Sequence, residues 1–456
     1  MAFLDENYLI TNETGKRIFR KIAKLPVYDA HNHANMQEIA ADQPYRDLWQ
    51  LLAATDHYVW EIMRKCGVKE EFITGDRTPK EKFLELARIM PLAVGNPVYE
   101  WLHLDLRRCF GIDDLLCEKN GEKIWNAGLA ELAKPENLPQ AMLTGKLNIG
   151  VMCSTDDPID LLKEHDQVNS AVGRTLVRPT WRPDKAMKIQ APGWNAYIDK
   201  LGARFGRTIR TYEDLLEILR MSHDYFAEHG CRASDHGVTL PPPEIALPAL
   251  TAQLFRRARD GETLTEQEIS AFQGSFLLDV AAMDADADWV FQCHAGAVRD
   301  VRTSLFEKLG PDVGGDVCNA AQDFLPGLLR LLNLYDGRLK TVLYTLDPVQ
   351  MPTLATVARA FGETVRLGSA WWLWDTPIGM RRQLEYIGSV DLLHTFAGMV
   401  SDSRKLTSYG SRFEMFRRTL ADVLGDISER GQAPEELLTD VAVRICGDGP
   451  KQFFNL

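Results

Sequence analysis

The sequence lacks the features of a disulfide-linked secreted protein and of a membrane protein. Its 456 residues include only 8 cysteines, and no two of them have C-x-x-C spacing, so no disulfide framework is predicted. No apolar stretch reaches the roughly 20 residues that a membrane-spanning helix needs. The opening residues, MAFLDENYLITNETGKR, lack the basic start and apolar core of a signal peptide. We therefore expect a soluble protein of the reducing cytoplasm.

An excess of positive charge is also missing, as are nucleotide-binding motifs. The chain has 52 lysines and arginines against 64 aspartates and glutamates, a formal charge of −12, which argues against a nucleic-acid surface. No G-x-G-x-x-G follows a predicted strand, and neither G-x-x-x-x-G-K-[ST] nor G-x-S-x-G occurs. An anionic substrate would need a local cluster of arginines to overcome the overall negative charge.

A short apolar or β-branched run recurs along the chain and ends each time in polar or charged residues. Segments with helical periodicity, such as residues 211–229 and 322–335, lie between these runs. Strands that alternate with helices indicate a parallel sheet. Eight of them predict an α/β fold, a distorted (β/α)8 barrel of the TIM type with its active site at the carboxyl ends of the strands. The predicted strands are residues 26–31, 147–153, 175–180, 231–236, 289–294, 340–346, 364–370 and 398–403.

The spacing of these strands is uneven and indicates two insertions. About 115 residues separate the first two runs, too many for one helix, and residues 35–146 have a helical pattern. Because this insertion follows the first strand, we expect it to cap the carboxyl-terminal face of the barrel. A second insertion spans about residues 237–288. We expect residues 1–456 to form a single catalytic barrel domain that includes both.

Histidines and an aspartate stand where the first and last predicted strands end. His31 and His33 follow the run PVYD, and Asp402 closes the eighth run. Alternate residues of a strand face the same side, and the first and last strands of a barrel are neighbours. Two imidazoles and a carboxylate suit a divalent metal such as zinc. Alone, His-x-His is as consistent with a surface turn, so the expectation rests on all three residues.

The chain resembles the uronate isomerase family within the amidohydrolase superfamily of metal-dependent barrels. The likeness extends through most of the sequence and includes the helical insertion. The matching segments, in chain order, are LPVYDAHNH, DHYVWEIMRKCGV, EEFITG, EKFLELA, GNPVYEWLHLDLRRCFGI, CSTDDP, RPDKA, GCRASDHG, QCHAGAVRD, GSAWWLWD and SDSRKLTSYGSRFEMFRR.

The resemblance implies an enzyme that isomerises hexuronates, D-glucuronate to D-fructuronate or D-galacturonate to D-tagaturonate. It also implies one bound divalent metal, with zinc expected, and a homo-oligomer. Moving a proton between C2 and C1 through a cis-enediol needs a base, a group that stabilises the enediolate, and a cation for the C6 carboxylate. The expected metal ligands are His31, His33 and Asp402. The expected catalytic residues are Asp402, Tyr58, Arg404 and His294, and the expected substrate-binding residues are Arg182, His236, Trp371 and Arg299.

Each of these assignments has a structural alternative. His294 could be a core histidine bonded to backbone, and for His236 the structural and functional interpretations are equally supported. Tyr58 could be ordinary packing within the insertion, and Arg182 a surface ion-pair partner. Several residues could supply the base, and the sequence alone does not distinguish among them.

A mononuclear metal-dependent hydrolase or lactonase of acidic sugars is the alternative function on the same scaffold. The fourth run has no lysine and the sixth no histidine, which are ligands that many two-metal hydrolases of this superfamily use. Their lack disfavours a two-metal hydrolase. A sugar-acid binding protein without catalysis is a third interpretation, and the intact set of His31, His33 and Asp402 argues against it.

Overall fold

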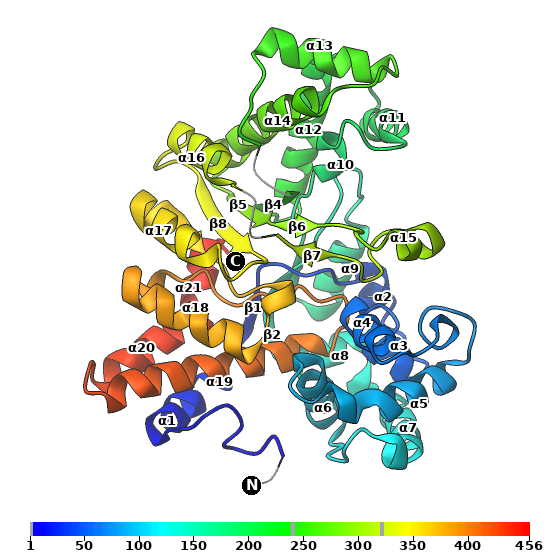
Figure 1. Cartoon of the computed structure of the whole chain (residues 1–456), viewed down its shortest axis with the longest axis vertical. Helices are drawn as coiled ribbons and strands as arrows, with labels where there is room; N and C mark the ends of the chain where they lie inside the picture. Colours follow the sequence, from blue (N-terminus) through cyan, green and yellow to red (C-terminus); the bar gives the residue numbers. More distant parts are fainter. Residues whose placement is uncertain (1–2, 239–241, 320–322) are drawn as a thin grey trace.

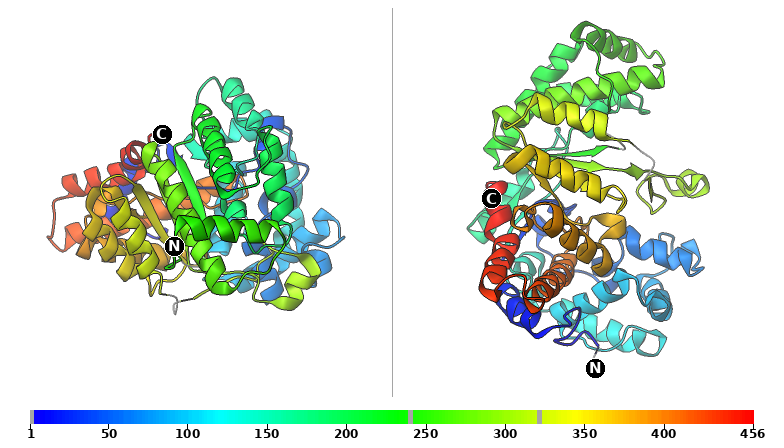
Figure 2. Two further views of the ribbon diagram at one scale, coloured as in Figure 1. Left: turned by 90° about the horizontal axis from the view of Figure 1, so that it is seen from above. Right: turned by 60° about the vertical axis from the view of Figure 1, so that its left-hand side comes forward.

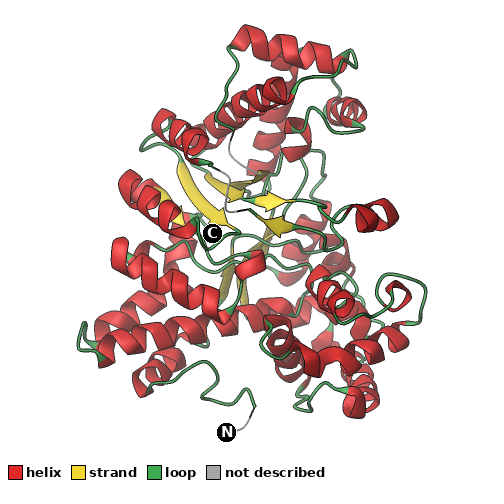
Figure 3. Cartoon of the chain, viewed as in Figure 1, coloured by secondary structure: helices red, strands yellow, loops and turns green. Residues whose placement is uncertain are grey.

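Two parallel sheets form the centre of the computed structural model, which describes residues 3–238, 242–319 and 323–456 (Figures 1 and 3). The first sheet has the order β1 (Val27–Asp29), β2 (Ile149–Cys153), β3 (Val177–Arg178). The second has the order β4 (Ala233–Val238), β5 (Val290–Ala295), β8 (Lys340–Thr345), β9 (Val365–Leu367). A single bridge between Trp181 and Ser234 connects the two sheets. The predicted α/β class is confirmed.

The eighth predicted strand is the exception, because residues 398–403 are not a strand. Gly398 has φ +99 and Asp402 has φ +47, and left-handed backbone cannot continue a strand. A few backbone hydrogen bonds connect the segment on both sides: Ala397 N donates to Leu367 O, whereas Asp402 N donates to His31 O and His33 N to Ser403 O. Among the described residues, strand pairing is therefore not continuous from β9 to β1, although this segment lies between them.

Helices follow the strands, as the alternating pattern predicts. Thr211 caps one of them in a capping box with Asp214, an arrangement that satisfies free backbone N–H groups at a helix start.

The antiparallel pair of β6 (Ala297–Val298) and β7 (Val317–Cys318) was not predicted. The helices between β2 and the segment 397–403 are α9 (Lys163–Val172), α10 (Asp184–Met187), α11 (Trp194–Arg204), α12 (Tyr212–Glu228), α13 (Pro248–Arg259), α14 (Glu266–Asp286), α15 (Thr303–Leu309), α16 (Leu325–Leu334), α17 (Met351–Phe361) and α18 (Pro377–Val390).

Seven helices lie between β1 and β2, within the segment predicted to be a helical insertion. These seven are α2 (Met36–Ala41), α3 (Leu48–Leu52), α4 (His57–Lys65), α5 (Pro79–Ile89), α6 (Pro97–Phe110), α7 (Glu118–Leu132) and α8 (Pro139–Thr144).

In the described chain, no helix combines the length and the apolar character needed to cross a membrane.

The two ends of the chain pack together below the sheets. Helix α1 (Glu13–Ile22) lies against α19 (Ser408–Glu429) and α20 (Glu435–Cys446), and α20 lies against α21 (Asp448–Phe453). Figure 2 shows the red carboxyl-terminal helices beside the blue first helix. A small buried cluster inside the strands includes Ala30, Ala233, Val290, Val342 and Val400. Both sheets and the 397–403 segment therefore contribute to one packed interior.

Candidate metal centre and active site

A cavity of about 870 Å³ opens at the carboxyl ends of the strands. This volume lies within the range of small-molecule sites, roughly 300–1,000 Å³. The predicted residues that line it are His31, His33, Arg182, His294, Arg299, Trp371, Asp402 and Arg404. His57, the first residue of α4, also lines it, so the 36–144 segment contributes to its wall.

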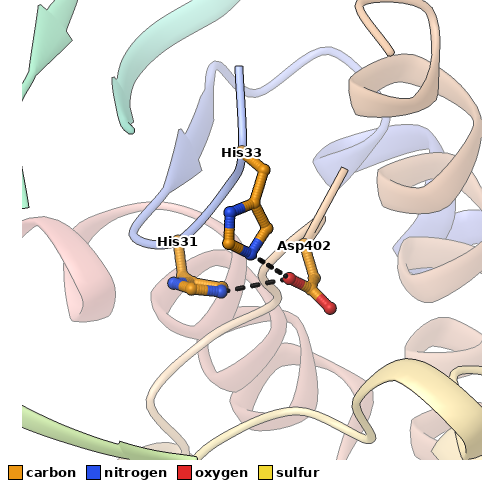
Figure 4. A group of neighbouring side chains, drawn as sticks. All are labelled: His31, His33 and Asp402. Atoms are coloured by element: carbon orange, nitrogen blue, oxygen red, sulfur yellow. Dashed lines mark hydrogen bonds and ion pairs between the residues drawn. The ribbon is translucent and has the colours of Figure 1, made fainter. Parts of the chain in front are cut away.

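Two histidines and one carboxylate oxygen meet at the end of β1. His31 Nε2 and His33 Nε2 lie 3.1 and 3.2 Å from the same atom, Asp402 Oδ1 (Figure 4). Backbone bonds hold the two segments together, since His33 N donates to Ser403 O and Asp402 N to His31 O. The other oxygen, Asp402 Oδ2, accepts from the Trp371 indole at 2.7 Å. The left-handed backbone at Asp402 is tolerated because aspartate visits this region more readily than most residues.

A second buried group shares His31 with the first. His294 Nδ1 lies 2.7 Å from Asp235 Oδ1, and His31 Nδ1 lies 3.6 Å from Asp235 Oδ2. Asp235 comes from β4 and His294 from β5, which are paired strands. A carboxylate at Nδ1 makes that nitrogen the N–H donor, which leaves the lone pair on Nε2. His294 Nε2 is buried and has no hydrogen-bond partner within the described chain.

Charge interactions keep both carboxylates ionised. Burial acts to raise the pKa of Asp235, but Arg182, His31 and His294 outweigh it and hold the pKa well below its usual value. The pKa of Asp402 is likewise held low, against burial, by His31 and His33. Burial, helped by the charge of His31, lowers the pKa of His294 to about 4. Near neutral pH the site therefore offers carboxylates and an uncharged imidazole.

This donor set fits a divalent metal. The ligand atoms of His31, His33 and Asp402 lie within 4.8 Å of one another, and so do those of His31, Asp235 and His294. Imidazole nitrogens and carboxylate oxygens are ligands of zinc and of other transition metals. The unpartnered Nε2 of His294 is the kind of buried atom that a metal or a substrate satisfies. The residues indicate a metal without identifying it.

The three cavity arginines differ in how fully their charges are already paired. Arg182 Nε lies 2.9 Å from Asp184, and its Nη1 lies 3.1 Å from buried Asp235. Arg404 has a carboxylate only at 3.8 Å, from Asp312. Arg299 is 2.9 Å from Asp316, and its guanidinium lies 4.5 Å above the Trp372 ring. Arg404 is therefore the cavity arginine with the weakest internal partner.

The structure does not bring two of the predicted residues to the cavity surface. His236 is buried behind β4, where its Nε2 lies 2.7 Å from Ser234 Oγ and its ring stacks on Phe291. Strand alternation turns its neighbour Asp235 inward instead, and this inward residue was the one that the sequence reasoning missed. Tyr58 lies beneath the cavity wall, where its ring stacks on His57 at 4.7 Å.

Comparisons with known proteins agree with the family resemblance seen in the sequence. A family model described as glucuronate isomerase matches residues 1–454. A uronate isomerase of Thermotoga petrophila is 45% identical over 452 residues, 99% of each chain. The crystal structure of the Thermotoga maritima uronate isomerase has a TM-score of 0.96 at 44% identity and covers 100% of both chains. A glucuronate isomerase structure from Caulobacter crescentus shares the fold, with a TM-score of 0.93 at 22% identity over 100% of this chain and 97% of that one.

The fold and the His–His–Asp cluster at its strand ends define the class, an α/β enzyme of the amidohydrolase type whose cluster could hold a metal ion. Within this class the chain belongs to the glucuronate isomerase family, because the family model covers nearly all of it. The resemblance predicted from the sequence motifs is confirmed.

Proposed function

We propose that the protein interconverts the aldose and ketose forms of a hexuronate by moving a proton between C2 and C1. The main support for this proposal is that His31, His33 and Asp402 meet in a cavity lined by arginines, in a chain that belongs to this family. The candidate reactions are D-glucuronate to D-fructuronate and D-galacturonate to D-tagaturonate, since the curated relatives are named uronate isomerases.

Arg404 is the first proposed binding residue for the C6 carboxylate, and Arg299 is the second, because its ion pairs with Asp312 and Asp316 leave the side chain more exposed than that of Arg182. Guanidinium groups bind carboxylates through two parallel hydrogen bonds. Arg182 was expected to take this role, but its charge is already met by Asp184 and Asp235. We assign Arg182 instead to holding Asp235 in its ionised form. Trp371, which lines the cavity and bonds Asp402, offers an aromatic surface for the sugar.

Asp402, His294 and Tyr58 are the proposed groups for proton transfer. Asp402 is ionised, and His294 presents an unprotonated Nε2, so either can accept a proton or a hydrogen bond from the substrate. The Tyr58 hydroxyl is buried beneath the cavity wall, so its proposed contact with a sugar oxygen requires the wall at His57 to shift. Arg404 adds positive charge for a developing enediolate.

His31, His33 and Asp402 are the proposed ligands of one divalent ion, with zinc as the proposed metal. Such an ion would act as a Lewis acid that polarises the sugar carbonyl. We also propose that residues 35–146 cap the barrel face, since His57 of this segment lines the cavity. Homo-oligomerisation and a cytoplasmic location remain predictions.

A proton NMR time course with D-glucuronate and D-galacturonate in D₂O tests the proposal. Metal-loaded protein should produce the ketose, and the deuterium content at C1 will report whether the transferred proton exchanges with solvent. Asp402→Asn is the control for contaminating activity. If the protein opens the ring of a lactone but forms no ketose from either hexuronate, the result supports the hydrolase alternative and refutes the isomerase.

A further inference from the structure

Arg412, in the first turns of α19, is buried with 1% of its surface exposed. Its guanidinium lies 4.7 Å from the centre of the Tyr58 ring and 4.1 Å from that of Trp101. Its Nη1 donates to Ser401 O at 2.7 Å and to Asp375 Oδ2 at 3.2 Å. The Arg412 side chain therefore contacts residues of α4 and α6 and also the backbone next to Asp402.

Lys405, three residues after Asp402, makes a second buried connection to the same helices. Its Nζ lies 3.2 Å from Asp56 Oδ2 and 3.4 Å from Asp105 Oδ2, and all three side chains are buried. Asp56 is the N-cap of α4, and its Oδ1 accepts from Tyr58 N at 3.0 Å. Lys405 thus reaches the Tyr58 backbone through one carboxylate, while Arg412 contacts the Tyr58 ring.

Arg412 also acts on the Tyr58 hydroxyl, where its positive charge lowers the pKa against the burial that raises it. The ring is held by packing against His57, Trp101 and Arg412. Burying cations is costly compared with burying apolar side chains of the same volume. Directional contacts to Ser401 O and to two aromatic rings are what a guanidinium supplies here and an apolar side chain does not.

We propose that Arg412 and Lys405 are positioning residues that hold Tyr58 in place relative to Asp402. The proposal rests on the isomerase function above, in which Tyr58 and Asp402 act on the same substrate. Both cations follow Asp402 in the chain, and both contact the helices that follow His31 and His33. They therefore set the distance between two catalytic groups that lie 344 positions apart in the sequence.

Kinetics of Arg412→Lys and Lys405→Met, with metal content measured for each, test this role. Displacing a catalytic group by about 1 Å can lower turnover about 100-fold, so kcat should fall by about that factor while KM changes less than threefold and metal content stays constant. Arg417→Met is the matched control, because Arg417 is buried on the same helix but bonds Ala23 O and Pro26 O and lies beside Cys446, away from Tyr58 and Asp402. This control should keep kcat and KM.

A double-mutant cycle separates positioning from general loss of structure. In a Tyr58→Phe background, Arg412→Lys should cost less than threefold in kcat, because the group that it positions is already gone. An equal loss in both backgrounds would overturn the proposal, as would wild-type kcat in Arg412→Lys. If Arg412→Lys does not fold, Lys405→Met in the two backgrounds gives the same comparison.

A measurement without substrate keeps the two proposals distinguishable. The protein is labelled with 3-fluorotyrosine, and the ¹⁹F resonance that disappears in Tyr58→Phe is assigned to Tyr58. This resonance should shift or broaden in Arg412→Lys and remain in place in Arg417→Met. A chain that fails to isomerise any hexuronate yet shows this shift would refute the proposed function alone, whereas an unmoved resonance would refute the positioning role.

Discussion

Replacing Arg182 should test whether this arginine holds Asp235 or binds the substrate carboxylate. In Arg182→Met, the fully buried Asp235 keeps only histidine partners. Removing one member of a buried ion pair costs about 3–5 kcal/mol, and the remaining contact with His294 favours the lower end. Unfolding entropy of about 2.1 cal/mol/K per residue amounts to roughly 1 kcal/mol per degree for 456 residues. The melting temperature should therefore fall by roughly 3–5 °C.

The pH dependence gives the sign of the effect. The folded pKa of Asp235 lies below its unfolded value near 4, so ionised Asp235 stabilises the fold above that pH, and this stabilisation is lost as the pH falls through the folded pKa. Without Arg182, burial raises the pKa and the carboxyl takes up a proton more easily. The difference between variant and wild type should then shrink from pH 7 toward pH 5.

Thermal unfolding of both proteins, loaded with the same metal, measures this difference. Arg178→Met is the matched control, because Arg178 is a neighbouring arginine on β3 that donates to backbone carbonyl oxygens in the described part of the chain. Adding Asp235→Asn to Arg182→Met should recover part of the lost stability. If Arg182→Met melts like wild type at pH 7 while its KM rises more than tenfold, Arg182 is the substrate's carboxylate partner and does not serve to hold Asp235.

Three further predictions concern the cavity and the β4 strand. Asp402→Asn should keep the fold, as judged by circular dichroism, but lose most turnover and bound metal, since it replaces the oxygen that faces both histidines; wild-type kcat would exclude Asp402 as ligand and base. Arg404→Met should raise KM for a hexuronate roughly 10- to 150-fold, the equivalent of about 1.5–3 kcal/mol for a charged hydrogen bond, and an unchanged KM would remove Arg404 from carboxylate binding. His236→Asn should lower the melting temperature but leave KM unchanged, because His236 packs behind β4 on Phe291; a higher KM at wild-type stability would return it to the substrate site.

The strand pattern was predictable from the sequence where the backbone is regular. Seven of the eight predicted runs contain strands, and the helix expected within residues 211–229 is α12. The eighth run has the apolar residues of a strand but contains left-handed backbone at Asp402, which a propensity argument does not detect. Even so, Asp402 lies beside His31, because hydrogen bonds to the neighbouring segments hold it there.

The site was predictable only as far as strand alternation could be assigned. His31 and His33 follow a clear apolar run, whereas Ser234, Asp235 and His236 form a polar stretch in which either parity could face inward. The structure turns Asp235 inward and His236 outward. Pairing of Arg182 with Asp184 and Asp235 could not be predicted either, since it depends on the spatial neighbourhood of β3 and β4.

The pairing of His31 with Asp402 has a consequence for how the protein is made. The two residues are 371 positions apart, and synthesis at about 5–20 residues per second separates their appearance by roughly 20–75 s. During that interval His31 and His33 exist without Asp402, although Asp235, the other carboxylate near His31, has already been made. A ribosome-bound chain therefore lacks the cluster of His31, His33 and Asp402 until nearly nine-tenths of it has been translated, so the proposed metal site can be completed only at a late stage of biosynthesis.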